Sequence, residues 1–104
     1  MVYVLVLQYE RHDPEKYQLY VDKVVPTIEQ FGGSVLAVDD NVTTLEGDWG
    51  AKRVVILSFP SATRARQWYE SPQYKAIKHL RTESVESEMF FIHGFGEGTS
   101  AAVH

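Results

Sequence analysis

The stretch from Arg53 to Tyr74 constrains the fold of this chain most strongly, because an apolar strand runs there directly into helices. Its first part, RVVILSF, consists mainly of β-branched, branched and aromatic residues, as expected of a strand covered on both faces. Pro60 ends this strand, and the hydroxyl of Ser61 can cap the first turn of a helix. Ser71 followed by Pro72 repeats the start signal, so we predict two short helices that point in different directions.

The other segments supply one long helix and three further strands. Asp13 and Pro14 start the helix, and its apolar residues recur three or four apart until Gly32 and Gly33 end it. Pro26 lies inside this helix and cannot donate a backbone hydrogen bond, so we expect a kink there. Apolar runs predict strands at 2–9, 34–38 and 89–95, with a continuation or hairpin arm at 42–45.

This order of elements predicts an α+β fold, a ferredoxin-like βαββαβ protomer with an antiparallel sheet. We expect a single domain over residues 1–95 and a flexible C-terminal tail over residues 96–104. Helices in this arrangement cover one face of the sheet, although the first, central and last strands look apolar on both faces. A second copy of the chain can cover the other face, because a two-fold interface lets one patch complement itself. We therefore expect a homodimer with its sheets packed face to face.

Composition narrows the possible partners and locations. Ten basic and fourteen acidic residues give a net charge of -4, which disfavours binding to nucleic acid. No apolar run approaches the roughly 20 residues of a membrane-spanning helix. The start of the chain reads as a strand and not as a signal peptide, so a cytoplasmic location is expected. The absence of cysteine excludes disulfides, thiolate metal sites and thiol catalysis.

Several separated motifs resemble the bacterial family catalogued as domain of unknown function 1330. They are DPEKYQLY at 13–20, FGG at 31–33, LEGDW at 45–49, RVVILSFPS at 53–61, WYESPQY at 68–74, and Arg81. The resemblance extends from Val2 to about Phe95. It implies membership of the dimeric α/β-barrel superfamily, with a ferredoxin-like protomer that pairs into a barrel and a cleft between helices and sheet in each protomer. It implies no established reaction.

The superfamily also contains small monooxygenases, haem-degrading enzymes, chlorite dismutases and lactone isomerases. In the haem-degrading branch, a histidine that ligates iron follows a helix tryptophan similar to Trp68. Lys78 occupies that position here, and His79 lies one residue further along. One residue rotates a helical side chain by about 100°, which turns His79 away from the cleft. We therefore expect no haem and no other cofactor.

Six residues are candidate ligand-binding residues, since they are aromatic or can grip an anion: Tyr20, Trp49, Arg53, Trp68, Tyr74 and Arg81. Aromatic residues such as these can stack a planar ligand, or they can simply fill the layer between helix and sheet. Arg53 and Arg81 can hold a carboxylate, or they can form structural ion pairs with acids such as Glu46 or Glu70.

His12 and Glu46 are the candidate catalytic residues. His12 follows the first strand, where loops often carry function, and it can equally be an exposed loop residue. Glu46 can act as a general base if burial beside Trp49 raises its pKa toward neutrality. The four histidines show no metal-ligand spacing, so no metal site is expected.

Three functions remain open from the sequence. The first is a homodimer that binds a small, partly apolar molecule, which can carry a carboxylate, in the cleft. The second is a cofactor-independent monooxygenase or isomerase that acts on a small aromatic or carboxylate-bearing substrate, with His12 or Glu46 moving the proton. The third is a structural dimer without a ligand.

Overall fold

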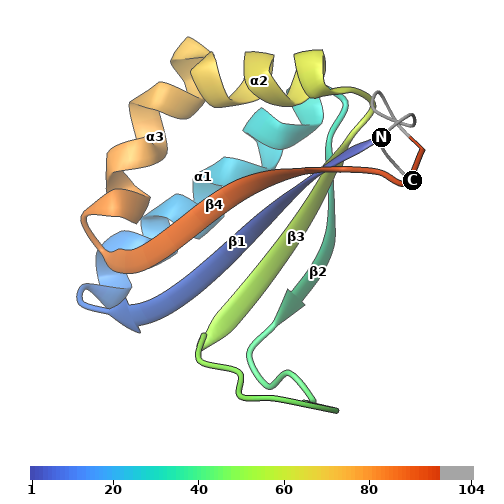
Figure 1. Ribbon diagram of the computed structural model, residues 1–104. Helices are drawn as coiled ribbons and strands as arrows, with labels where there is room; N and C mark the ends of the chain where they lie inside the picture. The colour runs from blue at the N-terminus through green and yellow to red at the C-terminus, as the bar shows by residue number, and fades with distance from the viewer. Residues whose placement is uncertain (97–104) are drawn as a thin grey trace.

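The computed structural model describes residues 1–96 as a four-stranded antiparallel sheet with all three helices on one face (Figure 1). The strands are β1 (Val2–Arg11), β2 (Ser34–Asp39), β3 (Arg53–Phe59) and β4 (Val85–His93), and the helices are α1 (Pro14–Gln30), α2 (Ala62–Glu70) and α3 (Pro72–Thr82). The strand order in the sheet is β2-β3-β1-β4. The predicted α+β, ferredoxin-like arrangement is confirmed. Residues 97–104 of the predicted tail lie outside the described residues.

The helices start where the sequence predicts. Asp13 caps α1 by accepting a hydrogen bond from the backbone of Lys16 at 3.0 Å, and α1 continues through Pro26. Ser61 caps α2, and Ser71 caps α3 by accepting from the backbone of Tyr74 at 3.1 Å. Ser71 is also the C-cap residue of α2, so one serine lies at the junction of both short helices and sets the change of direction between them.

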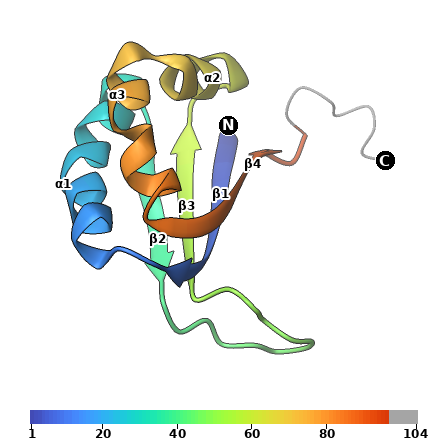
Figure 2. The same cartoon turned by 90° about the vertical axis from the view of Figure 1, so that its left-hand side faces the viewer.

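Two predicted strands have different bounds in the structure. Residues 42–45 form no strand, because the last residue of β2, Asp39, already pairs with Val54, and only Arg53 of β3 lies beyond that pair. The last strand runs from Val85 to His93 instead of from 89 to 95. Its early residues alternate between polar side chains and buried positions and therefore form no apolar run. The segment between β2 and β3 is therefore a long loop, which projects away from the helix layer in Figure 2.

The two faces of the sheet have different surroundings. On β1, the side chains of Val2, Val4, Val6 and Gln8 are buried under the helices, and the alternate residues are half-buried on the opposite face. The helix layer seals the inward face with Ile28, Trp68 and Tyr74. No helix of the described part covers the opposite face, as Figure 2 shows. The core thus lies between helices and sheet, and one broad face of the sheet is left open.

Candidate functional site

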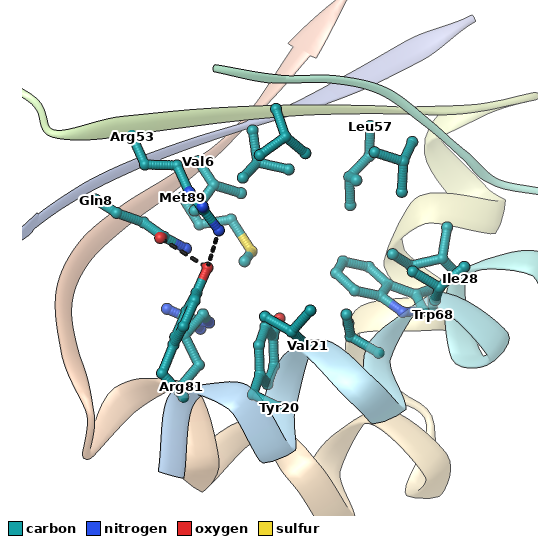
Figure 3. A pocket seen from close by; sticks show the side chains of 16 residues that line it. Val6, Gln8, Tyr20, Val21, Ile28, Arg53, Leu57, Trp68, Arg81 and Met89 are labelled. Atoms are coloured by element: carbon teal, nitrogen blue, oxygen red, sulfur yellow. Dashed lines mark hydrogen bonds between the residues drawn. The ribbon is translucent and has the colours of Figure 1, made fainter. Parts of the chain in front are cut away.

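A cavity of about 180 Å³ lies between α1 and the helix-facing side of the sheet (Figure 3). Most of the side chains that line it are aliphatic or aromatic, and a few are polar or charged. They are Val6, Gln8, Tyr17, Tyr20, Val21, Val24, Val25, Ile28, Val35, Val38, Arg53, Val55, Leu57, Trp68, Arg81 and Met89. Gln8 and Arg53 lie at one end and Ile28 and Trp68 at the other, so the cavity has a polar end and an apolar end.

Regular secondary structure directs these side chains into the cavity. In α1 the lining residues recur at helical spacing, so they form one stripe toward the sheet. In the sheet, Gln8 pairs with Arg53 and Val6 pairs with Val55, and residues directly opposite in antiparallel strands share a face. Trp68 is fixed at the apolar end, because its indole N–H donates to the Thr27 hydroxyl at 3.1 Å. The cavity is therefore built on rigid elements.

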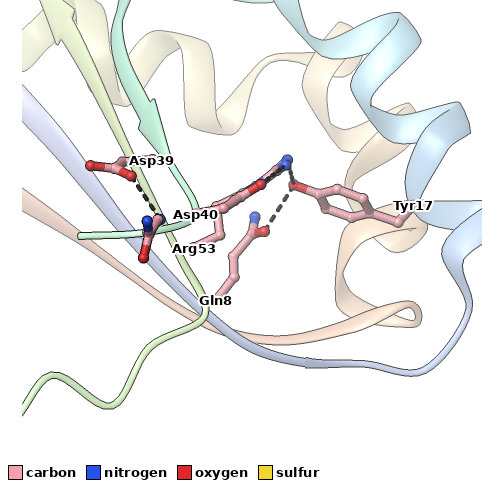
Figure 4. A network of polar contacts seen from close by, with 6 residues as sticks. Gln8, Tyr17, Asp39, Asp40 and Arg53 are labelled. Atoms are coloured by element: carbon pink, nitrogen blue, oxygen red, sulfur yellow. Dashed lines mark hydrogen bonds and ion pairs between the residues drawn. The ribbon is translucent and has the colours of Figure 1, made fainter. Parts of the chain in front are cut away.

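The first polar group at the cavity combines Gln8, Tyr17, Arg53 and Asp40 (Figure 4). The Tyr17 hydroxyl donates to Oε1 of Gln8 at 2.8 Å and accepts from Nη1 of Arg53 at 3.3 Å. Arg53 also donates through Nε and Nη2 to the two carboxylate oxygens of Asp40, at 2.5 and 2.8 Å. These hydrogen bonds raise the pKa of Arg53 and lower the pKa of Asp40. The charge of Arg53 is thus neutralised by a two-pronged ion pair.

The second polar group joins Arg81, Tyr74 and Tyr20. Nε of Arg81 donates to the Tyr74 hydroxyl at 3.2 Å, and the hydroxyls of Tyr74 and Tyr20 are 2.9 Å apart. Burial, together with the neighbouring Tyr74, raises the pKa of Tyr20 well above its ordinary value. Tyr20 therefore stays a neutral hydroxyl and does not serve as a phenolate base at neutral pH.

Five of the six predicted ligand-binding residues come together in this region. Tyr20, Arg53, Trp68 and Arg81 line the cavity, and Tyr74 lies directly behind them with its ring centroid 4.3 Å from that of Trp68. Among the two sequence interpretations of Arg53, the ion pair is observed, but its partner is Asp40 and not Glu46 or Glu70. Arg81 forms no ion pair within residues 1–96.

The remaining candidates lie outside the cavity. Glu46 and Trp49 are exposed in the loop between β2 and β3, where they flank a separate shallow surface hollow. Glu46 therefore lacks the burial that its interpretation as a general base requires. His12 is exposed at the end of β1, with Nε2 3.6 Å from a carboxylate oxygen of Glu86. Loop residues such as these are placed by the path of the chain, which local sequence patterns do not determine.

Sequence reasoning missed several lining residues, of which Gln8 and Met89 are the most informative. Gln8 is only 3% exposed, although it is polar. A signal for it exists in the sequence, because Gln8 continues the inward row of Val2, Val4 and Val6 and is the only polar member of that row. A polar residue at an inward position of an apolar strand indicates a buried hydrogen-bonding site.

Residues 1–96 contain no group of three or more His, Cys, Asp or Glu side chains that could hold a metal ion. Within the same residues, no helix is long and apolar enough to cross a membrane.

Fold and cavity together define a ferredoxin-like α+β protein with a pocket between its helix layer and its sheet. The chain belongs to the family described as "Domain of unknown function (DUF1330)", whose model matches residues 2–95. No curated protein matches it.

Solved structures share the fold. A protein of unknown function from Rhodopseudomonas palustris is 22% identical with a TM-score of 0.71, and the alignment covers 88% of this chain and 79% of that one. SnoaB, a cofactor-independent oxygenase from Streptomyces nogalater, is 12% identical with a TM-score of 0.64, covering 89% and 91% of the two chains. An antibiotic biosynthesis monooxygenase is 13% identical with a TM-score of 0.56, covering 90% and 98%. At these identities the likeness shows the fold alone.

Proposed function

We propose that the chain forms a homodimer in which each protomer binds a small, largely apolar molecule in the cavity between α1 and the sheet. The observation that carries this proposal is the cavity itself, whose walls are mostly apolar and whose polar groups gather at one end. Ligand sites in proteins commonly combine apolar walls with a few fixed polar groups. A cavity of about 150 Å³ holds benzene, so 180 Å³ suits a ligand of about six to ten non-hydrogen atoms.

The open face of the sheet supports the homodimer. Its apolar side chains come from β1, β3 and β4, and Phe90 and Ile92 are 45% and 43% exposed. A broad exposed apolar face marks an interaction site, and a second copy of the chain can cover it by two-fold symmetry. The loop between β2 and β3 projects toward the same side and carries Leu45, which is 91% exposed. The cytoplasmic location stays a prediction from the sequence.

Ligand-detected NMR tests the binding proposal with a set of aromatic and aliphatic molecules of about six to ten non-hydrogen atoms. We expect wild-type protein to bind members of the set and Val21→Phe to lose binding, because Val21 lines the cavity and a larger ring would fill it. Leu19→Phe is the matched control, since Leu19 is half exposed on the same helix outside the cavity. Absence of binding to wild type, or equal binding to Val21→Phe, would contradict the proposal.

A cofactor-independent monooxygenase or isomerase is the second candidate. Tyr20, a neutral hydroxyl, and Arg81, a cation, line the same cavity and can together stabilise a developing enolate or phenolate oxygen. The lining side chains include no His, Asp or Glu to remove a proton, so we place binding first. Oxygen uptake with electron-rich phenols above the protein-free rate, lost in Arg81→Met, would favour catalysis. A structural dimer without a ligand is the third candidate and predicts no binding at all.

A further inference from the structure

Arg81 is a buried cation whose hydrogen-bond partners are all neutral. The residue is 5% exposed. Its Nε donates to the Tyr74 hydroxyl at 3.2 Å, and its Nη1 donates to the Ser87 hydroxyl at 2.7 Å. Among the ion pairs formed within residues 1–96, none includes Arg81. A buried charge without an opposite charge is costly, so this arginine is a group that a bound anion would stabilise.

The carboxylates nearest to Arg81 in the sequence have other partners. Glu83 pairs with Lys16 at 3.1 Å, and Glu86 lies 3.6 Å from His12. Glu88 accepts a hydrogen bond from the Tyr9 hydroxyl at 2.8 Å, on the face of the sheet that the helices leave open. The chain therefore holds these acids away from Arg81.

Arg53 lines the same cavity but, unlike Arg81, is paired with a carboxylate. Its guanidinium group already makes two hydrogen bonds to the Asp40 carboxylate, so a ligand anion would have to compete with that pair. Arg81 meets no such competitor. Of the two arginines at the cavity, Arg81 is the one available to an anion.

One nitrogen of Arg81 remains for a ligand. Nη2 makes no hydrogen bond with residues 1–96, yet no buried side-chain nitrogen or oxygen in that range lacks a partner. Nη2 must therefore keep access to open space, and Arg81 lines the cavity. The cavity is thus an open space that borders this side chain.

The Tyr20 hydroxyl can supply a second donor beside Arg81. The Tyr74 oxygen accepts from Arg81, and it lies 2.9 Å from the Tyr20 oxygen. When Tyr74 donates its own proton to Tyr20, the proton of Tyr20 is left to point into the cavity that Tyr20 lines. The chain Arg81, Tyr74, Tyr20 then presents both a charged and a neutral donor to one ligand group.

We propose that the cavity recognises the carboxylate of a small apolar organic acid, with Nη2 of Arg81 and the hydroxyl of Tyr20 as donors and with the apolar body of the acid lying toward Ile28 and Trp68. This inference rests on the proposed binding function and names its ligand class. The acid is a monocarboxylate, because the second arginine at the site is already paired with Asp40.

The test compares matched ligands that differ in charge, with phenylacetate and hexanoate as the acids and phenylacetamide and hexanamide as neutral analogues of similar shape. Dissociation constants are measured by calorimetry or NMR titration for wild type, Arg81→Met and Arg81→Lys. Arg66→Met is the control, since it makes the same change at an exposed arginine that does not line the cavity. Acetate is included to separate an anion site from a site that needs the apolar body.

We expect wild type to bind at least one acid about tenfold or more tightly than its amide, which is the effect of a charge-assisted hydrogen bond. Arg81→Met should lose that preference, Arg66→Met should keep it, and acetate should bind much more weakly than the longer acids. Arg81→Lys, which keeps the charge but not the planar group, should retain only part of the preference.

The failure of this inference differs from the failure of the proposed function. Equal binding of acids and amides to wild type would overturn the carboxylate assignment and leave small-molecule binding intact. Persistence of the preference in Arg81→Met would also overturn it. Binding of none of the four ligands would overturn both. The comparison of acid with amide on wild type decides the point even if Arg81→Met does not fold.

Discussion

At the residue scale, the Tyr74 hydroxyl is the junction of the buried polar group, because it contacts both Tyr20 and Arg81. Its ring also lies in the aromatic cluster behind the cavity, with its centroid 4.3 Å from that of Trp68. A buried hydroxyl that loses its partner costs stability as well as orientation. The residues that shape the polar end of the cavity are thus also structural residues.

Tyr20→Phe tests this double role. The substitution removes the hydrogen bond between the Tyr20 and Tyr74 hydroxyls and should lower the free energy of unfolding by about 1 kcal/mol. Urea denaturation at fixed protein concentration measures the change. Tyr69→Phe is the control, because the Tyr69 hydroxyl makes no hydrogen bond within residues 1–96, and it should have a smaller effect. Equal effects of the two substitutions would show that the tyrosine pair contributes nothing specific.

The pair of Asp40 and Arg53 predicts a pH dependence of stability. The hydrogen bonds from Arg53 lower the pKa of Asp40 in the folded protein, so the unfolded chain takes up the proton first as the pH falls. The contribution of this pair is present above the unfolded pKa of about 3.9 and is lost as the pH falls through the lower folded pKa.

The free energy of unfolding of Asp40→Asn should therefore fall less steeply than that of wild type as the pH drops below about 4. Urea midpoints at several pH values, for wild type and Asp40→Asn, measure the difference. Asp48→Asn makes the same change in the same loop, and its curve should follow that of wild type. If the stability of Asp40→Asn fell with decreasing pH as steeply as that of wild type, the ion pair would make no contribution to stability in solution.

At the element scale, the junction of α2 and α3 orients the aromatic residues behind the cavity. The Ser71 hydroxyl donates to the backbone oxygen of Trp68 at 2.8 Å and accepts from the backbone of Tyr74 at 3.1 Å. One side chain thus ends the helix that carries Trp68 and starts the helix that carries Tyr74.

Ser71→Ala should destabilise the protein by about 1 to 2 kcal/mol, because it removes a buried cap shared by two helices. Ser61→Ala removes the cap of α2 alone, at a more exposed position, and should cost less. Thermal or urea unfolding of both variants measures the difference. A larger loss in Ser61→Ala than in Ser71→Ala would contradict this account of the junction.

The helix starts could be predicted from the sequence, whereas one of the strands could not. Caps at Asp13, Ser61 and Ser71 are local signals, and the predicted helices begin there. Helical spacing also placed Tyr20 and Trp68 toward the layer between helices and sheet. The strand predicted at 42–45 was wrong because pairing depends on where the neighbouring strand begins, which is a property of the sheet and not of those four residues.

The candidate site follows the same division. Four predicted residues lie on helices or strands and line one cavity: Tyr20, Arg53, Trp68 and Arg81. This agrees with the cleft between helices and sheet that the family resemblance implied. His12, Glu46 and Trp49 lie in loops or at a strand end, and their positions depend on long-range packing. The pairing of Arg53 with Asp40 is likewise a tertiary contact between residues 13 apart in the sequence, and no local pattern marks it.

At the scale of the whole molecule, the open face of the sheet carries exposed apolar side chains such as Phe90 and Ile92. Ile92→Lys should convert the proposed homodimer into a monomer, because it places a charge on the open face of the edge strand β4, which a second copy would bury. Light scattering after gel filtration measures the mass. Leu19→Lys, the same type of change at an exposed residue of α1, should leave the dimer intact. A wild-type protein that is monomeric at micromolar concentration would contradict the homodimer.

Native mass spectrometry of freshly purified protein is the measurement that tests the proposed function most directly, because it weighs both the assembly and any small molecule it carries. We predict a mass of twice 11.9 kDa plus a small organic component that is absent from Val21→Phe. A bare monomer, or a component retained unchanged when the cavity is filled, would contradict the proposal that a dimer of this chain holds its ligand beneath α1.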